Sequence, residues 1–117
     1  MIALSSEKQY LYRQLELTPE EVGFIELMLA ATPVAITGQA TMLPLSSLLG
    51  VWGGDRSALP QVRKCLMCLV ERMRSIDYRG GSILSFPILG SFHISDDGSF
   101  LLYQFNEMFL DVLIKFC

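Results

Sequence analysis

The chain has 117 residues, of which 51% are apolar, and a formal net charge of −3. This length is enough for one domain with its own core, without help from disulfides or metal ions. Although the mean hydropathy is high at +0.41, no run approaches the roughly 18 apolar residues of a membrane span. The first twelve residues also lack the basic start and apolar centre of a signal peptide. We therefore expect a single cytoplasmic domain over residues 1–117, with no membrane association.

The first clear helix start is at Thr18. Threonine caps helices well, Pro19 suits the first helical position, and the two glutamates that follow favour the positive end of the helix dipole. We predict a helix over Pro19–Ala31, ended by Thr32-Pro33, and a short weak helix or arm before it. Because apolar residues cover more than one face of this helix, it is expected to lie at the centre of the core or against a partner.

A helix-turn-helix is predicted between Leu45 and Ser75. Val34–Leu43 alternates as a short strand does, the run 44–50 has the size of one short helix, and the Gly-Gly-Asp run at 53–55 marks a turn. From Leu59 a longer helix is expected, because apolar residues recur at helical spacing with basic residues mostly opposite. Two helices joined by a glycine-containing turn are typical of this motif.

After Ser75 the pattern becomes extended. A short strand at 76–79, a Gly-Gly turn and a strand over Ile83–Ser95, bent or interrupted at Pro87 and Gly90, are predicted. Asp96-Asp97-Gly98 is a strong hairpin signal, so we expect Ser99–Phe105 to return beside the preceding strand as a wing. Asn106 then caps a last helix.

Most of the positive charge lies in residues 56–79, which carry +4 while the rest of the chain carries −7. Helix geometry at about 100° per residue places Arg63, Lys64 and Arg74 in one broad polar arc, which could face phosphates or simply be solvated. The candidate DNA-binding residues are the six cations of this segment, Arg56, Arg63, Lys64, Arg72, Arg74 and Arg79.

No catalytic or metal site is predicted, and no cofactor. Cys65 and Cys68 have the spacing of zinc and redox sites, but a structural zinc site needs four ligands, and only Cys117 and the single histidine, His93, remain. A redox site needs an exposed thiolate of low pKa, whereas these cysteines lie within an apolar helix. We interpret them as reduced core cysteines and His93 as a structural or solvated residue.

The order of helices and strands, together with particular runs, resembles a known family. The basic and then leucine-rich run Val62–Met73, the hairpin from Ile83 to Gln104, and Phe105-Asn106-Glu107 leading into Leu110–Leu113 are similar to the first winged-helix domain of theta-type plasmid replication initiators. Leu17–Ala31 occupies the place of that family's Leu-Thr-rich helix start. The resemblance implies an α+β winged-helix fold, a helix-turn-helix followed by a β-hairpin wing.

In that family the first domain mediates dimerisation and supplementary phosphate contacts, and a second domain reads repeated origin sequences. The resemblance therefore implies a homodimer, weak contact with origin DNA in replication initiation, and host replication proteins as further partners. The chain has room for one such domain and stops at Cys117 within a predicted helix, which suggests a piece of a two-domain initiator or a shortened variant.

Two other classes of function are considered. A small acidic homodimeric interaction module, similar to a secretion chaperone, would explain the apolar hairpin and last helix, but it has no need to collect positive charge on one helix. An enzyme is not expected, because no nucleophile, base and oxyanion donor can be assembled from the sequence.

Overall fold

The computed structural model describes residues 6–32, 40–50, 56–77 and 79–116. Helices and strands are mixed along these ranges, and short 3-10 turns occupy Arg56–Ala58 and Arg79–Gly81. The helices are α1 (Ser6–Gln14), α2 (Pro19–Ala31), α3 (Leu45–Leu49), α4 (Leu59–Glu71) and α5 (Glu107–Phe116). The strands are β1 (Thr41–Pro44), β2 (Arg74–Asp77), β3 (Ile83–Phe86), β4 (Leu89–Ile94) and β5 (Phe100–Phe105).

Helix α2 begins and ends where the sequence predicted. The Thr18 hydroxyl accepts a hydrogen bond from the Glu21 amide at 3.2 Å, and the Glu21 carboxylate accepts one from the Thr18 amide at 3.0 Å. This reciprocal capping box satisfies two amides that the helix itself leaves unpaired. Phe24, Ile25 and Met28 are fully buried, so α2 lies at the centre of the core as expected.

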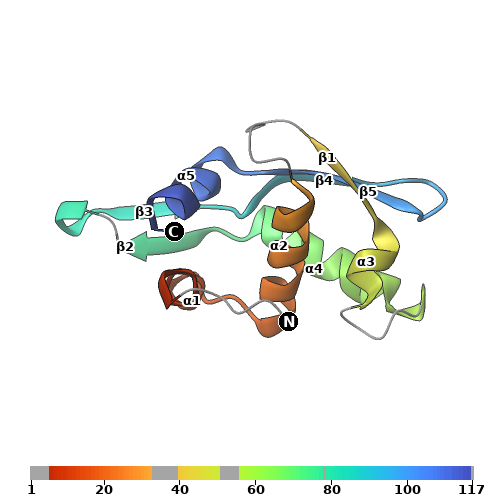
Figure 1. The fold of residues 1–117 in the computed structure, drawn as a ribbon, viewed down its shortest axis with the longest axis horizontal. Helices are drawn as coiled ribbons and strands as arrows, with labels where there is room; N and C mark the ends of the chain where they lie inside the picture. Colours follow the sequence, from red (N-terminus) through yellow and green to blue (C-terminus); the bar gives the residue numbers. More distant parts are fainter. Residues whose placement is uncertain (1–5, 33–39, 51–55, 78, 117) are drawn as a thin grey trace.

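Helices α3 and α4 confirm the two helices of the predicted helix-turn-helix, and Figure 1 shows α2, α3 and α4 on the same side of a three-stranded sheet. Helix α4 buries Val62, Leu66 and Leu69 in the core. The predicted turn at 53–55 and the first part of the predicted strand, residues 34–39, lie outside the described residues. Within them that strand begins at Thr41.

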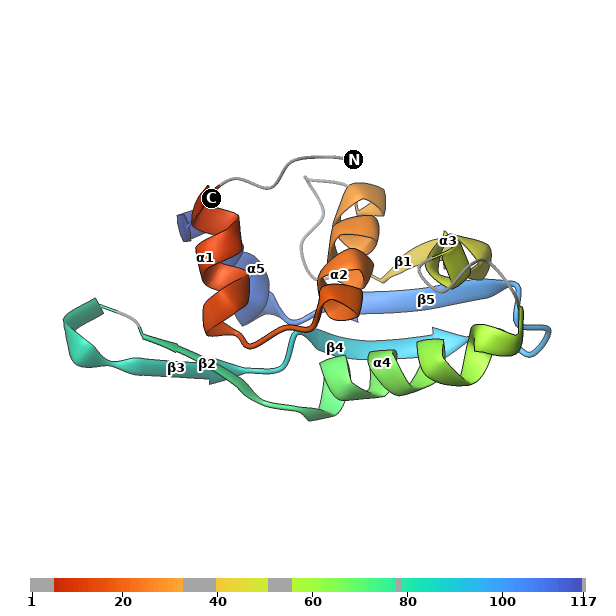
Figure 2. The ribbon, with the colours of Figure 1, turned by 90° about the horizontal axis from the view of Figure 1, so that it is seen from below.

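The three-stranded sheet is antiparallel in the order β1-β5-β4. Strands β4 and β5 form the predicted hairpin, which turns at Asp96–Gly98 with Gly98 at a φ of 74°. Glycine is needed there because a Cβ disfavours positive φ. The hairpin projects beyond α3 and α4 at one end of the molecule (Figures 1 and 2).

One predicted strand is divided in two. Ile83–Ser95 was expected to be bent or interrupted at Pro87 and Gly90 and to lie beside β5, but β3 pairs with β2 instead, and only β4 pairs with β5. The division falls at Pro87, which has no amide hydrogen, and at Ile88. The Ile88 amide donates to the Leu69 carbonyl at 3.1 Å and its carbonyl accepts from the Asn106 amide at 3.0 Å. These bonds hold the chain between α4 and α5, so β2–β3 becomes a separate hairpin.

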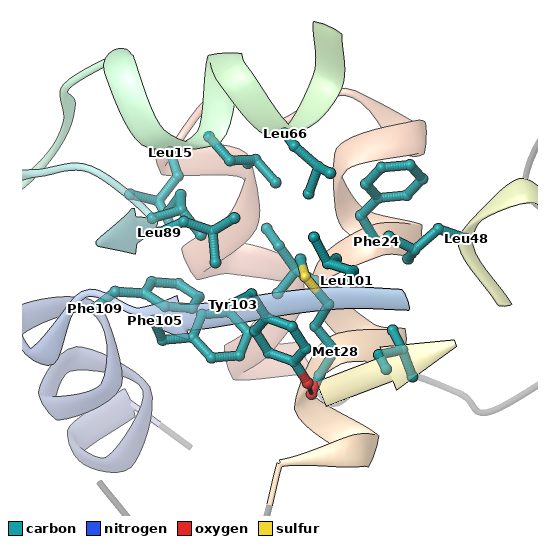
Figure 3. Close-up of a cluster of buried hydrophobic side chains, with 14 of the residues drawn as sticks. Leu15, Phe24, Met28, Leu48, Leu66, Leu89, Leu101, Tyr103, Phe105 and Phe109 are labelled. Atoms are coloured by element: carbon teal, nitrogen blue, oxygen red, sulfur yellow. Dashed lines mark hydrogen bonds between the residues drawn. The ribbon is translucent and has the colours of Figure 1, made fainter. Parts of the chain in front are cut away.

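Aromatic side chains join the sheet to the helices (Figure 3). The rings of Tyr103 and Phe105 meet edge to face with centroids 5.7 Å apart, and Phe105 packs on Phe109 of α5 at 5.6 Å. The Tyr103 hydroxyl donates to the Met28 carbonyl at 2.6 Å, and burial raises the pKa of this phenol. Each such buried side chain is worth about 1.5–3 kcal/mol. The sheet and α2 therefore share one continuous core.

Candidate nucleic-acid interface

Helix α4 presents two adjacent cations to solvent. Its buried stripe of Val62, Leu66 and Leu69 fixes the rotation of the helix, and Arg63 and Lys64 are consequently exposed. They border a depression of about 390 Å³ together with Leu59, Pro60 and Met67. The face that they form is called the α4 face below. Guanidinium and ammonium groups on an exposed helix face can reach the phosphates of a nucleic acid.

Arg72 extends this charge to the end of α4. It is the residue that follows the helix, and its guanidinium lies 3.7 Å from the carboxylate of Glu16. The two side chains are 57% and 78% exposed. An exposed pair of this kind contributes about 0–1 kcal/mol, so a phosphate could replace the carboxylate at little cost.

Arg74 is a correction to the sequence prediction. It was assigned to a polar arc with Arg63 and Lys64, but it lies in β2, and its side chain is only 2% exposed. Its guanidinium pairs with the Glu21 carboxylate at 2.5 Å and donates to the backbone carbonyls of Leu15 and Glu16 at 3.1 and 3.2 Å. A group enclosed in this way cannot reach phosphates, so Arg74 is a structural residue.

The last two predicted cations are separated along the molecule. Arg56 begins the 3-10 turn before α4, and Arg79 begins the turn at the tip of the β2–β3 hairpin. Figure 1 shows these turns at opposite ends of the long axis, which is 47 Å. The six candidates therefore do not form one patch. Among the side chains that the structure describes, Arg63, Lys64 and Arg72 remain available on α4 and its end.

The cysteines differ from each other. Cys65 is partly buried, and burial, followed by the negative charge of Glu21, raises its pKa to about 12. Cys68 is exposed, which corrects its prediction as a core residue. A helix turns about 300° in three residues, so Cys68 lies about 60° around the helix axis from Cys65, on the side exposed to solvent. Cys117 lies outside the described residues.

His93 is exposed on β4, opposite Leu102 of β5. In the described part of the chain, no three histidine, cysteine or acidic side chains gather where they could hold a metal ion. No helix among the same residues is long and apolar enough to cross a membrane.

The tip of the β4–β5 hairpin is a negatively charged feature of the structure. Asp96 and Asp97 are both exposed there. The sequence predicted the turn correctly. Residues 89–105 contain no lysine or arginine, and this absence was the sequence signal for a negatively charged hairpin. The hairpin therefore contributes negative charge only.

Comparison with known proteins shows a likeness in fold. No family model matches the chain, and no curated protein matches it either. Among solved structures, it is similar to the WH1 domain of MSBI1.176, described as a replication protein isolated from a multiple sclerosis patient. The match has a TM-score of 0.51 and 12% sequence identity, and covers 83% of this chain and 76% of that one. The chain therefore has an α+β winged-helix fold.

Proposed function

We propose that this chain is a replication-initiator-type winged-helix domain that self-associates and makes auxiliary contacts with the DNA phosphate backbone, without enzymatic chemistry. The fold likeness to a WH1 domain whose parent is described as a replication protein supports this choice. The α4 face supports the DNA contact, because its two cations are exposed to solvent while the apolar stripe of the same helix is buried in the core.

The exposed pair Arg63 and Lys64 is the observation that carries the proposal. Both side chains lie in the first half of α4, and the nearest acid in the helix is Glu71 at its last residue. Among the described residues, neither Arg63 nor Lys64 forms an ion pair with an acid, whereas Arg72 and Arg74 do. The exposure of this pair and the absence of an ion pair on it within the described part of the chain support phosphate contact at the α4 face.

The number of contacts sets the expected strength of binding. Each phosphate neutralised on duplex DNA adds about 0.9 to the slope of log affinity against log salt. If Arg63, Lys64 and Arg72 each neutralise one phosphate, raising the salt concentration from 50 to 200 mM should lower the affinity about 40-fold. Binding that depends on three phosphate contacts is weak and tolerant of sequence, with a Kd of about 1–100 µM.

The test is fluorescence anisotropy with a random labelled duplex over a series of salt concentrations. The double variant R63A/K64A should lose most of the low-salt affinity and reduce the slope by about 1.8. A matched control, R13A/K115A, removes the same net charge from α1 and α5 and should keep the slope. If both variants behave alike, or if the intact protein binds no duplex at low salt, the phosphate-contact role is wrong.

Self-association is the second part of the proposal, and the outer face of the three-stranded sheet supports it. Met42, Phe100 and Leu102 are 62%, 45% and 38% exposed, and Met42 lies directly opposite Leu102 in the strand register. Apolar side chains gathered in this way on a sheet face are typical of surfaces that are covered by a partner. A second copy of the chain would cover them symmetrically.

A further inference from the structure

The wing of this domain, defined as the turn Ser95–Ser99 with strands β4 and β5, has an unusual charge for a module that contacts DNA. Its tip carries Asp96 and Asp97, and neither strand contains lysine or arginine. Its one histidine, His93, is exposed on β4. The wing has two negative charges to present to a nearby phosphate and no fixed positive one.

The tip is held in one conformation by its own hydrogen bonds. The Asp97 carboxylate accepts from the Ser99 amide at 3.0 Å and from the Ser95 hydroxyl at 2.8 Å, and these bonds lower the pKa of Asp97. The Ser95 hydroxyl oxygen in turn accepts from the Phe100 amide at 3.0 Å. Because the same bonds that build the turn favour the ionised carboxylate, the charge at the tip persists at neutral pH.

The wing tip is also fixed near the start of α4. The Ser99 carbonyl accepts from the amide of Leu45, the first residue of α3, at 2.9 Å, and both α3 and β4 pack against α4. Figures 1 and 2, which view the molecule from directions 90° apart, both show the β4–β5 turn and the first turn of α4 at the same end. Arg63 and Lys64 lie in that half of the helix.

We propose that the acidic wing tip repels duplex DNA and so confines phosphate contact to the α4 face. This inference rests on the proposed DNA contact and specifies how the duplex can approach. Duplex DNA carries one charge per about 1.7 Å of its axis, so a segment bound to the first half of α4 continues past the wing. Repulsion between exposed charges is felt over about 10 Å at 0.1 M salt. The wing thereby limits affinity.

The experiment removes the wing charge without removing its hydrogen bonds. In D96N/D97N the asparagine at 97 retains the oxygen that accepts from Ser99 and Ser95. Affinity for a random duplex should rise about three- to tenfold at 50 mM salt, from the loss of several screened repulsions. The matched control D111N/E107Q removes the same charge from α5, which lies far from the β4–β5 turn in Figure 1, and should change affinity less than twofold.

A charge reversal separates relief of repulsion from a new contact. D96K adds a cation at the tip and should steepen the salt slope by about 0.9 per phosphate gained, whereas D96N/D97N should leave the number of contacts unchanged. Thermal unfolding of each variant by circular dichroism, in the absence of DNA, checks that the fold is intact.

The outcomes distinguish this inference from the proposed function. If the intact protein binds DNA through Arg63 and Lys64 but D96N/D97N binds no better, or no better than the α5 control, the wing inference is wrong and the DNA contact stands. If intact protein and wing variants all fail to bind at low salt, both are wrong. Tighter binding by D96N/D97N than by the intact protein, with both lost on adding R63A/K64A, supports the inference most directly.

Discussion

At the scale of single residues, two cysteines that lie three positions apart in α4 differ in their exposure to solvent. Cys65 is partly buried beside the α2 N-terminus, where Glu20 and Glu21 further disfavour a thiolate. Cys68 is exposed. Both border a groove of about 300 Å³ between α2 and α4. Because the thiolate is the reactive form of cysteine, the two residues should differ in chemical reactivity although they share one motif.

We predict that Cys68 reacts with an aromatic disulfide reagent at pH 8 at least about tenfold faster than Cys65. A raised pKa lowers the thiolate fraction at every pH below it, so labelling of Cys65 should increase about tenfold per pH unit between pH 8 and 10. The measurement is the labelling rate of C68S/C117S and C65S/C117S, which leave one thiol each. Equal rates in the folded proteins would contradict the prediction, and equal rates in urea provide the control.

At the scale of elements, a buried ion pair attaches the β2–β3 hairpin to the helices. Arg74 of β2 reaches the carboxylate of Glu21 in the first turn of α2 and the carbonyls at the end of α1. Its Nε has no hydrogen-bond partner among the described residues. The hairpin has two short strands, too few for independent stability, so this attachment and the packing of Ile76 and Phe86 fix its position.

We predict that R74M lowers the free energy of unfolding by about 3–5 kcal/mol, because it leaves the Glu21 carboxylate buried without its counter-ion. The double variant R74M/E21Q, which keeps an oxygen for the Thr18 amide, should recover a large part of this loss. The exposed Arg72 provides the control, since R72M should change stability by less than about 0.5 kcal/mol.

Urea unfolding followed by circular dichroism measures all three variants. If R74M itself does not fold, the double variant still tests the explanation, because an uncompensated carboxylate predicts that E21Q restores folding. A double variant no more stable than R74M would show that the ion pair is not the cause.

At the scale of the whole molecule, charge and apolar surface are on different faces. The cations of the α4 face lie on the helix side of the three-stranded sheet, where Figure 1 shows α4. Met42, Phe100 and Leu102 alternate with buried residues along β1 and β5, so they lie on the opposite side of the sheet. A dimer formed through the sheet would therefore leave both α4 faces open to DNA. The two proposed activities are compatible on geometric grounds.

We predict that the protein sediments as a dimer at micromolar concentration and that L102K weakens the dimer by more than about tenfold. The burial of one leucine contributes about 1.5–3 kcal/mol, and a lysine there would be desolvated without a partner. I114K is the control, since Ile114 is 71% exposed on α5. A monomer at all concentrations would leave the DNA contact as the domain's proposed activity, while a dimer without DNA binding would favour the protein-interaction module.

The sequence by itself determined the elements that depend on local chemistry. The Thr18-Pro19 start predicted α2, the apolar spacing predicted α4, Asp96–Gly98 predicted the wing turn, and Asn106 predicted the start of α5, where its side chain accepts from the Met108 amide at 2.9 Å. Caps, turns and helical periodicity arise from residues within a few positions of each other, so one sequence contains their whole cause.

Only the tertiary structure decided which strands pair and which cations are exposed. Pairing of β3 with β2 instead of β5 depends on the bonds of Ile88 to Leu69 and Asn106, which lie far away in the sequence. Arg74 and Arg63 are both arginines of one basic segment, but Arg74 is buried in an ion pair with a carboxylate of α2, whereas Arg63 is exposed. Burial of a charge depends on a distant partner, which periodicity cannot reveal.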